Sequence, residues 1–292
     1  MPGHVSATCV PLRTGSGDHL RLLTGPRTPF GPANVWFVPA PTFAHSLLGW
    51  KRSSKNKLGW EHVPNNADID NRESLQLSAA MLESLAAHTG QELPSPPPGP
   101  GGLLEEAVRI DLARELEARD SSRRWTARRG AFVTDYSQYV HLLHLNQLVI
   151  DNPTLSVTIG QDYLIKPDVL IGLEDVPTVN GLPMLHAAVS CKWTIRSDRV
   201  QNIRHENNQM VRHRRGRQPH LVAVTAEPLP SRLAAIARGT GEVDAVYHIA
   251  YDELHAAVQA SNNVGQQSAW GEITGQGRLL NYNLLGEHLA CW

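Results

Sequence analysis

Between residues 186 and 195 the chain reads HAAVSCKWTI, where apolar and polar side chains alternate as they do in a β-strand. Val189 and Cys191 share one face of this predicted strand, and Ser190 and Lys192 share the other. The spacing of two residues therefore places a hydroxyl group and an ammonium group side by side on the same face of a sheet.

The segments on either side of this strand extend the pattern. Upstream, YLIKPDVLIG (163–172) is β-rich, and the proline before Asp168 suits the start of a strand. Downstream, Ser197 can cap a helix with an apolar stripe, and Glu206 lies at the rim of that stripe. A carboxylate in this position can fold back towards the ends of the strands.

Helices and strands alternate through the second half of the chain. Strands are predicted over 221–225 and 245–250, and helices over 230–237 and 252–260. This alternation predicts an α/β fold with a central mixed β-sheet flanked by helices.

The chain divides into three segments by composition and periodicity. Residues 1–55 are rich in Gly, Pro and Thr and are interpreted as an irregular N-terminal extension. Residues 56–260 contain the periodic segments and form the predicted functional domain, while residues 261–292 are polar and receive no assignment. Further helices are predicted over 71–88, 103–119 and 135–146, with a polyproline-like linker over 93–102.

The composition suits a soluble globular enzyme, with 41% hydrophobic and 19% charged residues in 292. No run approaches the roughly 18 to 20 apolar residues of a membrane helix. The N-terminus lacks the pattern of a signal peptide, so we expect a cytoplasmic protein that makes no membrane contact. Cys9, Cys191 and Cys291 are too few and too scattered for a disulfide framework or a zinc knuckle.

Charge is distributed unevenly. The formal net charge of −1 argues against a general polyanion binder, but residues 192–217 contain eight Lys and Arg against two acidic residues. A local basic stripe of this kind is expected of a surface that contacts phosphates. By charge alone, a solvated helix face explains it equally well.

Asp168, Ser190, Lys192 and Glu206 together match the needs of phosphodiester hydrolysis. This reaction needs a divalent cation on the phosphate oxygens, a group that helps water attack, and neutralisation of the developing charge. Magnesium prefers oxygen ligands and usually takes one or two protein carboxylates. Each residue alone is a weak signal, because turn aspartates and strand-end lysines are common. The ordered set is more specific and predicts a Mg²⁺-dependent nuclease site.

The residues directly after this strand suit the reading of base pairs. Arg196, Asp198 and Arg199 lie at the N-terminus of the following helix, and helix N-termini commonly enter the major groove of DNA. Arginine pairs with guanine O6 and N7, and aspartate accepts from cytosine N4. The segment is therefore a chemically sensible reader of G·C pairs. The alternative is a surface helix start with a capping aspartate and solvated arginines.

At this point the chain resembles a known family. SCKWTIRSDRVQN (190–202) and the segment 215–248 closely resemble NgoMIV-type type II restriction endonucleases, the CCGG-recognising group of the PD-(D/E)xK superfamily. YLIKPDVLIG and the helix GLLEEAV also match, so the resemblance covers roughly residues 60 to 258. It implies a homotetramer, or a homodimer, that belongs to a restriction-modification system. The implied enzyme cuts double-stranded DNA at GCCGGC and leaves 5′ overhangs.

The resemblance also implies catalytic roles. Asp168 corresponds to the metal-bridging carboxylate, and Lys192 to the residue that stabilises the reacting phosphate and orients the water. Ser190 and Glu206 complete the catalytic motif, with the glutamate on the helix replacing the usual acidic residue before the lysine. The main-chain carbonyl of Cys191 is a further metal contact, which directs its side chain into the core.

Other roles follow from the same resemblance. Arg196, Asp198 and Arg199 correspond to the readers of the CCGG core. An additional active-site glutamate lies on the family's early helix, where Glu106 matches best and Glu105 is the competitor.

The chain departs from the family pattern in two places. The connection between Asp168 and Lys192 is shorter, and the family's glutamine that reads the outer base pair has no clear counterpart, so the bases flanking CCGG are open. Two alternatives also stay open. One is a PD-(D/E)xK nuclease of repair or mobile-element type with looser specificity. The other is an inactive DNA-binding relative, which would require broken catalytic positions, whereas Asp168, Lys192 and Glu206 are all present.

Overall fold

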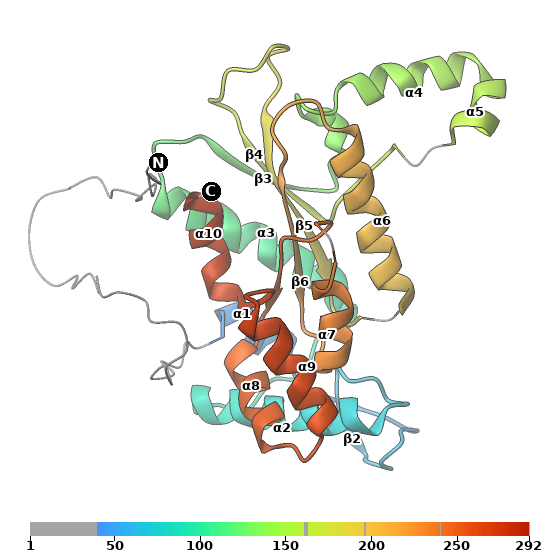
Figure 1. Cartoon of the computed structure of the whole chain (residues 1–292). Helices are drawn as coiled ribbons and strands as arrows, with labels where there is room; N and C mark the ends of the chain where they lie inside the picture. Colours follow the sequence, from blue (N-terminus) through green and yellow to red (C-terminus); the bar gives the residue numbers. More distant parts are fainter. Residues whose placement is uncertain (1–39, 161–162, 196, 240, 292) are drawn as a thin grey trace, which may run out of the picture.

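The computed structural model describes residues 40–160, 163–195, 197–239 and 241–291 (Figure 1). Within these ranges a six-stranded sheet with the order β3-β4-β5-β6-β7-β8 forms the centre. β4 pairs antiparallel with both β3 and β5, whereas β5 to β8 run parallel to one another, so the predicted mixed sheet is confirmed. The strands are β3 (Trp125–Arg129), β4 (Val169–Leu173), β5 (Met184–Lys192), β6 (His220–Thr225), β7 (Ala245–His248) and β8 (Leu279–Asn281).

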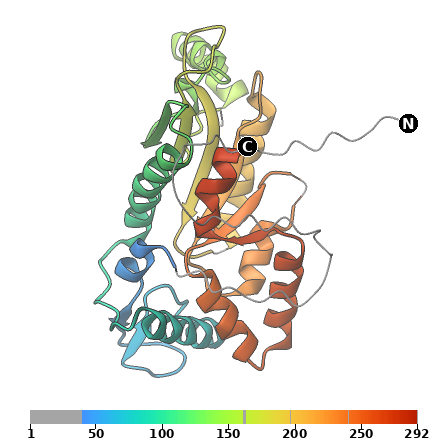
Figure 2. The same cartoon turned by 90° about the vertical axis from the view of Figure 1, so that its left-hand side faces the viewer.

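Helices cover both faces and the lower end of this sheet (Figures 1 and 2). A small hairpin of β1 (Trp50–Arg52) and β2 (His62–Pro64) lies beside α2, which packs on α8. The helices are α1 (Thr42–Leu47), α2 (Arg72–Thr89), α3 (Pro100–Arg119), α4 (His141–Asp151), α5 (Pro153–Ile159), α6 (Ser197–His213), α7 (Pro230–Ala237), α8 (Tyr251–Ala260), α9 (Val264–Gly275) and α10 (Leu285–Cys291), with short 3-10 turns at Val133–Asp135 (η1) and Tyr282–Leu284 (η2).

The alternation of β5 directs its side chains into two different cores. Val189 and Cys191 pack in one hydrophobic cluster with Leu104 of α3. Ala188, on the opposite face, packs in a second cluster with Met210 of α6. Figure 2 shows α3 and α6 on opposite sides of the sheet. The predicted alternation is therefore correct, and both faces of the strand are covered.

The strand register decides where the candidate site forms. β4 and β5 are antiparallel, and Val169 at the start of β4 pairs with Val189 near the end of β5. β6 runs parallel to β5, so Lys192 pairs with Thr225 at the same end of the sheet. Asp168, the residue before β4, is thereby carried to the last residues of β5. Two positions that are 24 residues apart in sequence meet at one end of the sheet.

The helices predicted over 71–88 and 230–237 are confirmed by α2 and α7. The helix predicted over 103–119 is confirmed by α3, but α3 begins at Pro100, so the last three residues of the linker predicted over 93–102 are helical, because proline is tolerated in the first turn of a helix. The helix predicted over 135–146 begins later, because η1 precedes α4. β3 was not predicted, since five residues at a sheet edge with two exposed arginines show little alternation.

The segment after residue 260, which had no assignment, forms α9, β8 and α10. β8 has only three residues and pairs with β7, so the segment extends the same sheet. Residues 1–39 of the predicted N-terminal extension lie outside the described residues, whereas the rest of it contains α1 and β1 and is not irregular, because β1 pairs with β2 and α1 packs on the core. Within the described ranges, no helix is both long and apolar enough to cross a membrane.

Candidate active site

A carboxylate and an ammonium group meet where β4 begins and β5 ends. Asp168 Oδ2 accepts a hydrogen bond from Lys192 Nζ at 2.7 Å and another from the Cys191 backbone N–H at 2.8 Å. The side chains of Asp168 and Lys192 are 19% and 26% exposed. The pair is therefore fixed by the sheet and still open to a ligand.

The two residues of β5 directly before Lys192 alternate between the faces of the strand. Ser190 is 3% exposed and lies on the same face as Lys192. Burial raises the pKa of the Cys191 thiol well above its usual range, so this side chain stays neutral in the core. Only the backbone of Cys191 faces the site, where its N–H donates to Asp168.

Glu206 on α6 joins this group from the neighbouring helix. Burial raises the pKa of its carboxyl group, attraction to Lys192 lowers the pKa, and repulsion from Asp168 raises it. Both charges of the strand pair therefore act on Glu206. The structure thus places Asp168 and Lys192 in direct contact, and the charges of both act on Glu206. The catalytic roles of these residues stay a prediction.

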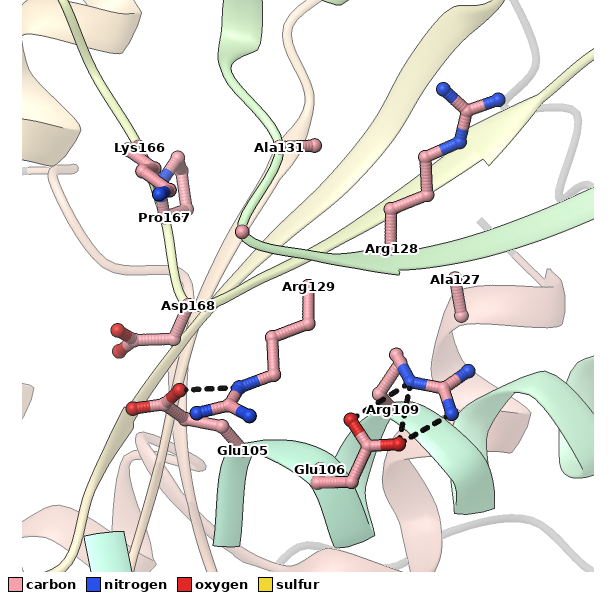
Figure 3. A pocket seen from close by; sticks show the side chains of 11 residues that line it. Glu105, Glu106, Arg109, Ala127, Arg128, Arg129, Ala131, Lys166, Pro167 and Asp168 are labelled. Atoms are coloured by element: carbon pink, nitrogen blue, oxygen red, sulfur yellow. Dashed lines mark hydrogen bonds and ion pairs between the residues drawn. The ribbon is translucent and has the colours of Figure 1, made fainter. Parts of the chain in front are cut away.

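An open cavity of about 840 Å³ adjoins Asp168 (Figure 3). It lies between the N-terminal part of α3, the end of β3 and the residues before β4. Four basic side chains line it, which makes it a suitable place for phosphate groups. These are Arg109, Arg128, Arg129 and Lys166.

The two adjacent glutamates of α3 take different partners. Arg129 Nε donates to Glu105 Oε2 at 2.7 Å, and Glu105 acts electrostatically on Cys191, as Asp168 does. Glu106 instead forms an ion pair with Arg109 at 2.5 Å, and this hydrogen bond lowers the pKa of Glu106. In Figure 3 the Glu105 carboxylate lies beneath Asp168, whereas Glu106 is turned to Arg109.

The geometry therefore brings Glu105, and not Glu106, towards Asp168. The sequence prediction favoured Glu106 by its match to the family's early helix, with Glu105 as the competitor. Arg129 was missed because its strand, β3, was not predicted. The sequence does contain a signal for Arg129, because the short segment WTARR (125–129) ends in two adjacent arginines.

The donor set at this end of the sheet suits magnesium. Among the described residues, no three His, Cys, Asp or Glu side chains are grouped closely enough to hold a metal ion. Magnesium needs only one or two carboxylates and keeps several waters, so Asp168 with one further oxygen ligand suffices. Both hydrogen bonds to Asp168 use Oδ2, and within the described ranges nothing donates to Oδ1. This oxygen is available for a cation.

The predicted base-reading residues cannot be placed. Arg196 lies outside the described residues, as do the side chains of Asp198 and Arg199. The backbone of α6 begins at Ser197, directly after the β5 strand that carries Lys192. The chain therefore leads from the candidate catalytic lysine into this helix within five residues.

Comparison with known proteins agrees with this geometry. The model of the NgoMIV restriction enzyme family matches residues 53–180 and 176–280 of the chain. The chain belongs to the NgoMIV restriction enzyme family. It is 37% identical over 251 residues to the type II restriction enzyme NgoMIV of Neisseria gonorrhoeae, covering 75% of this chain and 86% of the relative. Membership makes it a type II restriction endonuclease, a site-specific deoxyribonuclease.

A solved structure is also similar to this chain. It is the type IIF restriction endonuclease Bse634I with cognate DNA, with a TM-score of 0.36 and 13% sequence identity. The match covers 73% of this chain and 96% of that chain.

Glu206→Gln is expected to raise the free energy of unfolding near neutral pH. The folded pKa of Glu206 lies above the ordinary value of 4.5, so the folded chain binds more protons than the unfolded chain. The stability that this group contributes is complete below the unfolded pKa and is lost as pH rises through the folded pKa. Urea unfolding between about pH 4.5 and pH 8 measures the loss, which the variant should reduce.

Glu83→Gln is the matched control, because Glu83 lies on the exposed face of α2 and its substitution should leave the pH dependence unchanged. An identical pH dependence in the wild type and in Glu206→Gln would contradict the position assigned to Glu206.

Proposed function

We propose that this enzyme is a Mg²⁺-dependent endonuclease that cuts double-stranded DNA within the palindrome GCCGGC and leaves 5′ overhangs. The observation that carries the proposal is the contact between Asp168 and Lys192, with Glu206 acting on both. This is the carboxylate, lysine and helix-borne glutamate arrangement that the sequence motif predicts. The assignment of the DNA sequence rests on the segment Arg196 to Arg199 and on its likeness to the NgoMIV family.

In this proposal the residues around Asp168 divide the work. When bound, Mg²⁺ supplies Lewis-acid stabilisation of the phosphate and acidifies a water molecule. Asp168, through its Oδ1, and the main-chain carbonyl of Cys191 would hold the cation. Lys192 orients the attacking water and offsets the negative charge that develops on the phosphate oxygens. Ser190 supports this face of β5, and Glu206 accepts a proton in the half-buried space beside Lys192.

We assign the additional carboxylate of α3 to Glu105. Its carboxylate is oriented towards Asp168 and is paired with Arg129 across the cavity. Glu106 is occupied by Arg109 on its own helix, three residues away. The sequence prediction favoured Glu106. We propose Glu105 instead, because its side chain lies on the part of α3 that faces Asp168 and pairs with Arg129 of β3.

A palindromic site requires two copies of the chain related by a two-fold axis. We propose a homotetramer, as the family resemblance implies, with a homodimer as the smaller assembly. Figure 1 shows α4 and α5 extending away from the sheet. This arm exposes large apolar side chains, and such surfaces commonly mark protein contacts. They include Leu143 (52% exposed), Leu148 (57%), Ile150 (61%) and Val157 (89%).

We also propose that the enzyme acts in the cytoplasm as part of a restriction-modification system. The described helices include no membrane span, and cellular DNA requires protection from an enzyme of this kind.

Incubation of the purified protein with plasmid DNA and Mg²⁺, followed by sequencing of the DNA ends, tests the function directly. Lys192→Ala is expected to reduce cleavage by about a hundredfold or more, because the developing charge loses its partner. Binding to the cleaved sequence in Ca²⁺ should persist. Lys55→Ala, a change at an exposed lysine outside the cavity, is the control.

Scattered ends would favour a repair-type nuclease, and intact DNA in every metal would favour an inactive relative. Retained cutting by Lys192→Ala would remove the role assigned to this lysine.

Glu105→Gln and Glu106→Gln form a matched pair of neighbouring substitutions. Glu105→Gln is expected to raise the Mg²⁺ concentration for half-maximal cleavage by about tenfold or more, because a carboxylate beside the metal-binding aspartate is neutralised. Glu106→Gln should leave this concentration within about threefold of the wild-type value, since its partner is Arg109. A magnesium titration of the cleavage rate measures both, and the reverse order would reject the assignment of Glu105.

Arg199→Ala is expected to weaken Ca²⁺-supported binding to CCGG-containing DNA much more than binding to a scrambled duplex. The loss of one bidentate contact with guanine corresponds to roughly 1–3 kcal/mol. Arg212→Ala, at the other end of α6, is the control for a general loss of positive charge. Equal weakening on both duplexes would make Arg199 a phosphate contact instead.

A further inference from the structure

A buried carboxylate lies on the far side of the connection between β5 and α6. Glu227 follows the end of β6 and is 0% exposed. Its Oε2 accepts a hydrogen bond from the Ile195 backbone N–H at 2.7 Å, and its Oε1 accepts one from the Leu229 backbone N–H at 3.1 Å. One side chain therefore joins two chain segments, the exit of β5 and the turn into α7.

Neighbouring polar groups hold Glu227 from several directions. The Glu227 N–H donates to Thr225 Oγ1 at 3.1 Å, and the Glu227 carbonyl oxygen lies 3.1 Å from Nε2 of the fully buried His248. Arg232 approaches the carboxylate at 3.8 Å and forms an ion pair with Asp68 at 2.5 Å. The backbone of Glu227 is thus held from β6 and β7, while its carboxylate is approached by Arg232 of α7.

Burial of the Glu227 carboxylate opposes its ionisation. Burial raises the pKa of Glu227 to about 7, although the two backbone N–H groups and Arg232 oppose the shift. An apolar side chain in its place would leave the N–H groups of Ile195 and Leu229 without this acceptor. A buried charged group is weak support for overall stability, and a role in fixing one conformation is a better explanation.

The position of Ile195 in the sequence indicates what is fixed. Ile195 is three residues after Lys192 and directly precedes Arg196, the first of the proposed base readers. Its side chain is 1% exposed, and its backbone N–H is held by Glu227. Ile195, the residue directly before the proposed reading segment, is therefore anchored by the turn that follows β6, the strand next to β5.

We propose that Glu227 is a positioning residue for sequence recognition. It fixes Ile195 at the exit of β5, three residues after Lys192, and so sets the point from which the chain continues into the proposed base readers. The inference rests on the proposed function, since it assigns this segment to base reading. Glu227 itself contacts neither the DNA nor the reacting phosphate in this role.

The test compares Glu227→Gln with Glu253→Gln. Glutamine keeps the shape of the side chain, but its amide group turns a donor towards one of the two backbone N–H groups. Glu253 is the matched control, because it is also a buried carboxylate, is 1% exposed, and pairs with His88 on α2. Thermal unfolding first establishes that both variants are folded. Glu227→Asp is a second variant at the same position, because it keeps the negative charge but has a shorter side chain.

Two measurements are made on each protein. The first is amide hydrogen exchange in the peptide that contains Ile195, where Glu227→Gln should accelerate exchange of this amide by about tenfold or more. The second is the ratio of Ca²⁺-supported affinities for the sequence that the wild type cuts and for a scrambled duplex. Glu227→Gln should lower this ratio by about tenfold to a hundredfold, whereas Glu253→Gln should leave both measurements at wild-type values.

An unchanged affinity ratio in both Glu227 variants would overturn the inference, as would unchanged exchange at Ile195. An equal fall of the ratio in Glu253→Gln would reduce the effect to general destabilisation and would also overturn it. If the wild type cuts no DNA, the proposed function fails separately. The exchange at Ile195 then still shows whether Glu227 anchors the exit of β5.

Discussion

The hydrogen bonds that Asp168 accepts from Lys192 and from the Cys191 N–H join the start of β4 to the end of β5. The side chains of Lys192 and Asp168 are only 26% and 19% exposed, so the cost of removing both charges from water offsets their attraction. The pair is therefore weak evidence for a contribution to the stability of the fold. The pair depends on the fold, because the two hydrophobic cores on either face of β5 fix the pleat that presents Lys192 to Asp168. This constraint places the Lys192 ammonium group in contact with Asp168 Oδ2 and leaves Asp168 Oδ1 available.

The cavity beside this pair combines both signs of charge. Glu105 and Arg129 form one ion pair across it, and Glu106 and Arg109 form another along α3. A surface that must accept both a divalent cation and a phosphate needs carboxylates and guanidinium groups within a short distance. The helix α3 and the edge strand β3 supply these carboxylates and guanidinium groups. Glu206 comes from α6, on the opposite side of the sheet from α3. The candidate site is therefore built from both layers that cover the sheet.

Two half-buried or buried glutamates flank the connection between β5 and α6. The charges of Lys192 and Asp168, at the end of β5, act on Glu206. Glu227 holds the exit of β5 by accepting a hydrogen bond from the Ile195 N–H. Burial raises the pKa of both. In our proposals the first serves cleavage and the second serves recognition. The shared strand keeps the two tasks in a fixed spatial relation, because a shift of β5 would move Lys192 and the reading segment together.

The sequence alone predicted the residues of the candidate site and most of the core fold. The alternation of HAAVSCKWTI predicted β5 and its two faces, and the order of Asp168, Ser190, Lys192 and Glu206 predicted a set that the structure brings together, since periodicity is a local property of the chain. Tertiary structure decided what depends on contacts between distant segments. The pairing of β3 and β8 with the sheet, the pairing of Glu105 with Arg129, and the anchoring of Ile195 by Glu227 arise from partners that lie 24 residues or more apart in sequence. Such partners leave no periodic signal, because the free energy that selects them comes from packing and hydrogen bonding in the folded state.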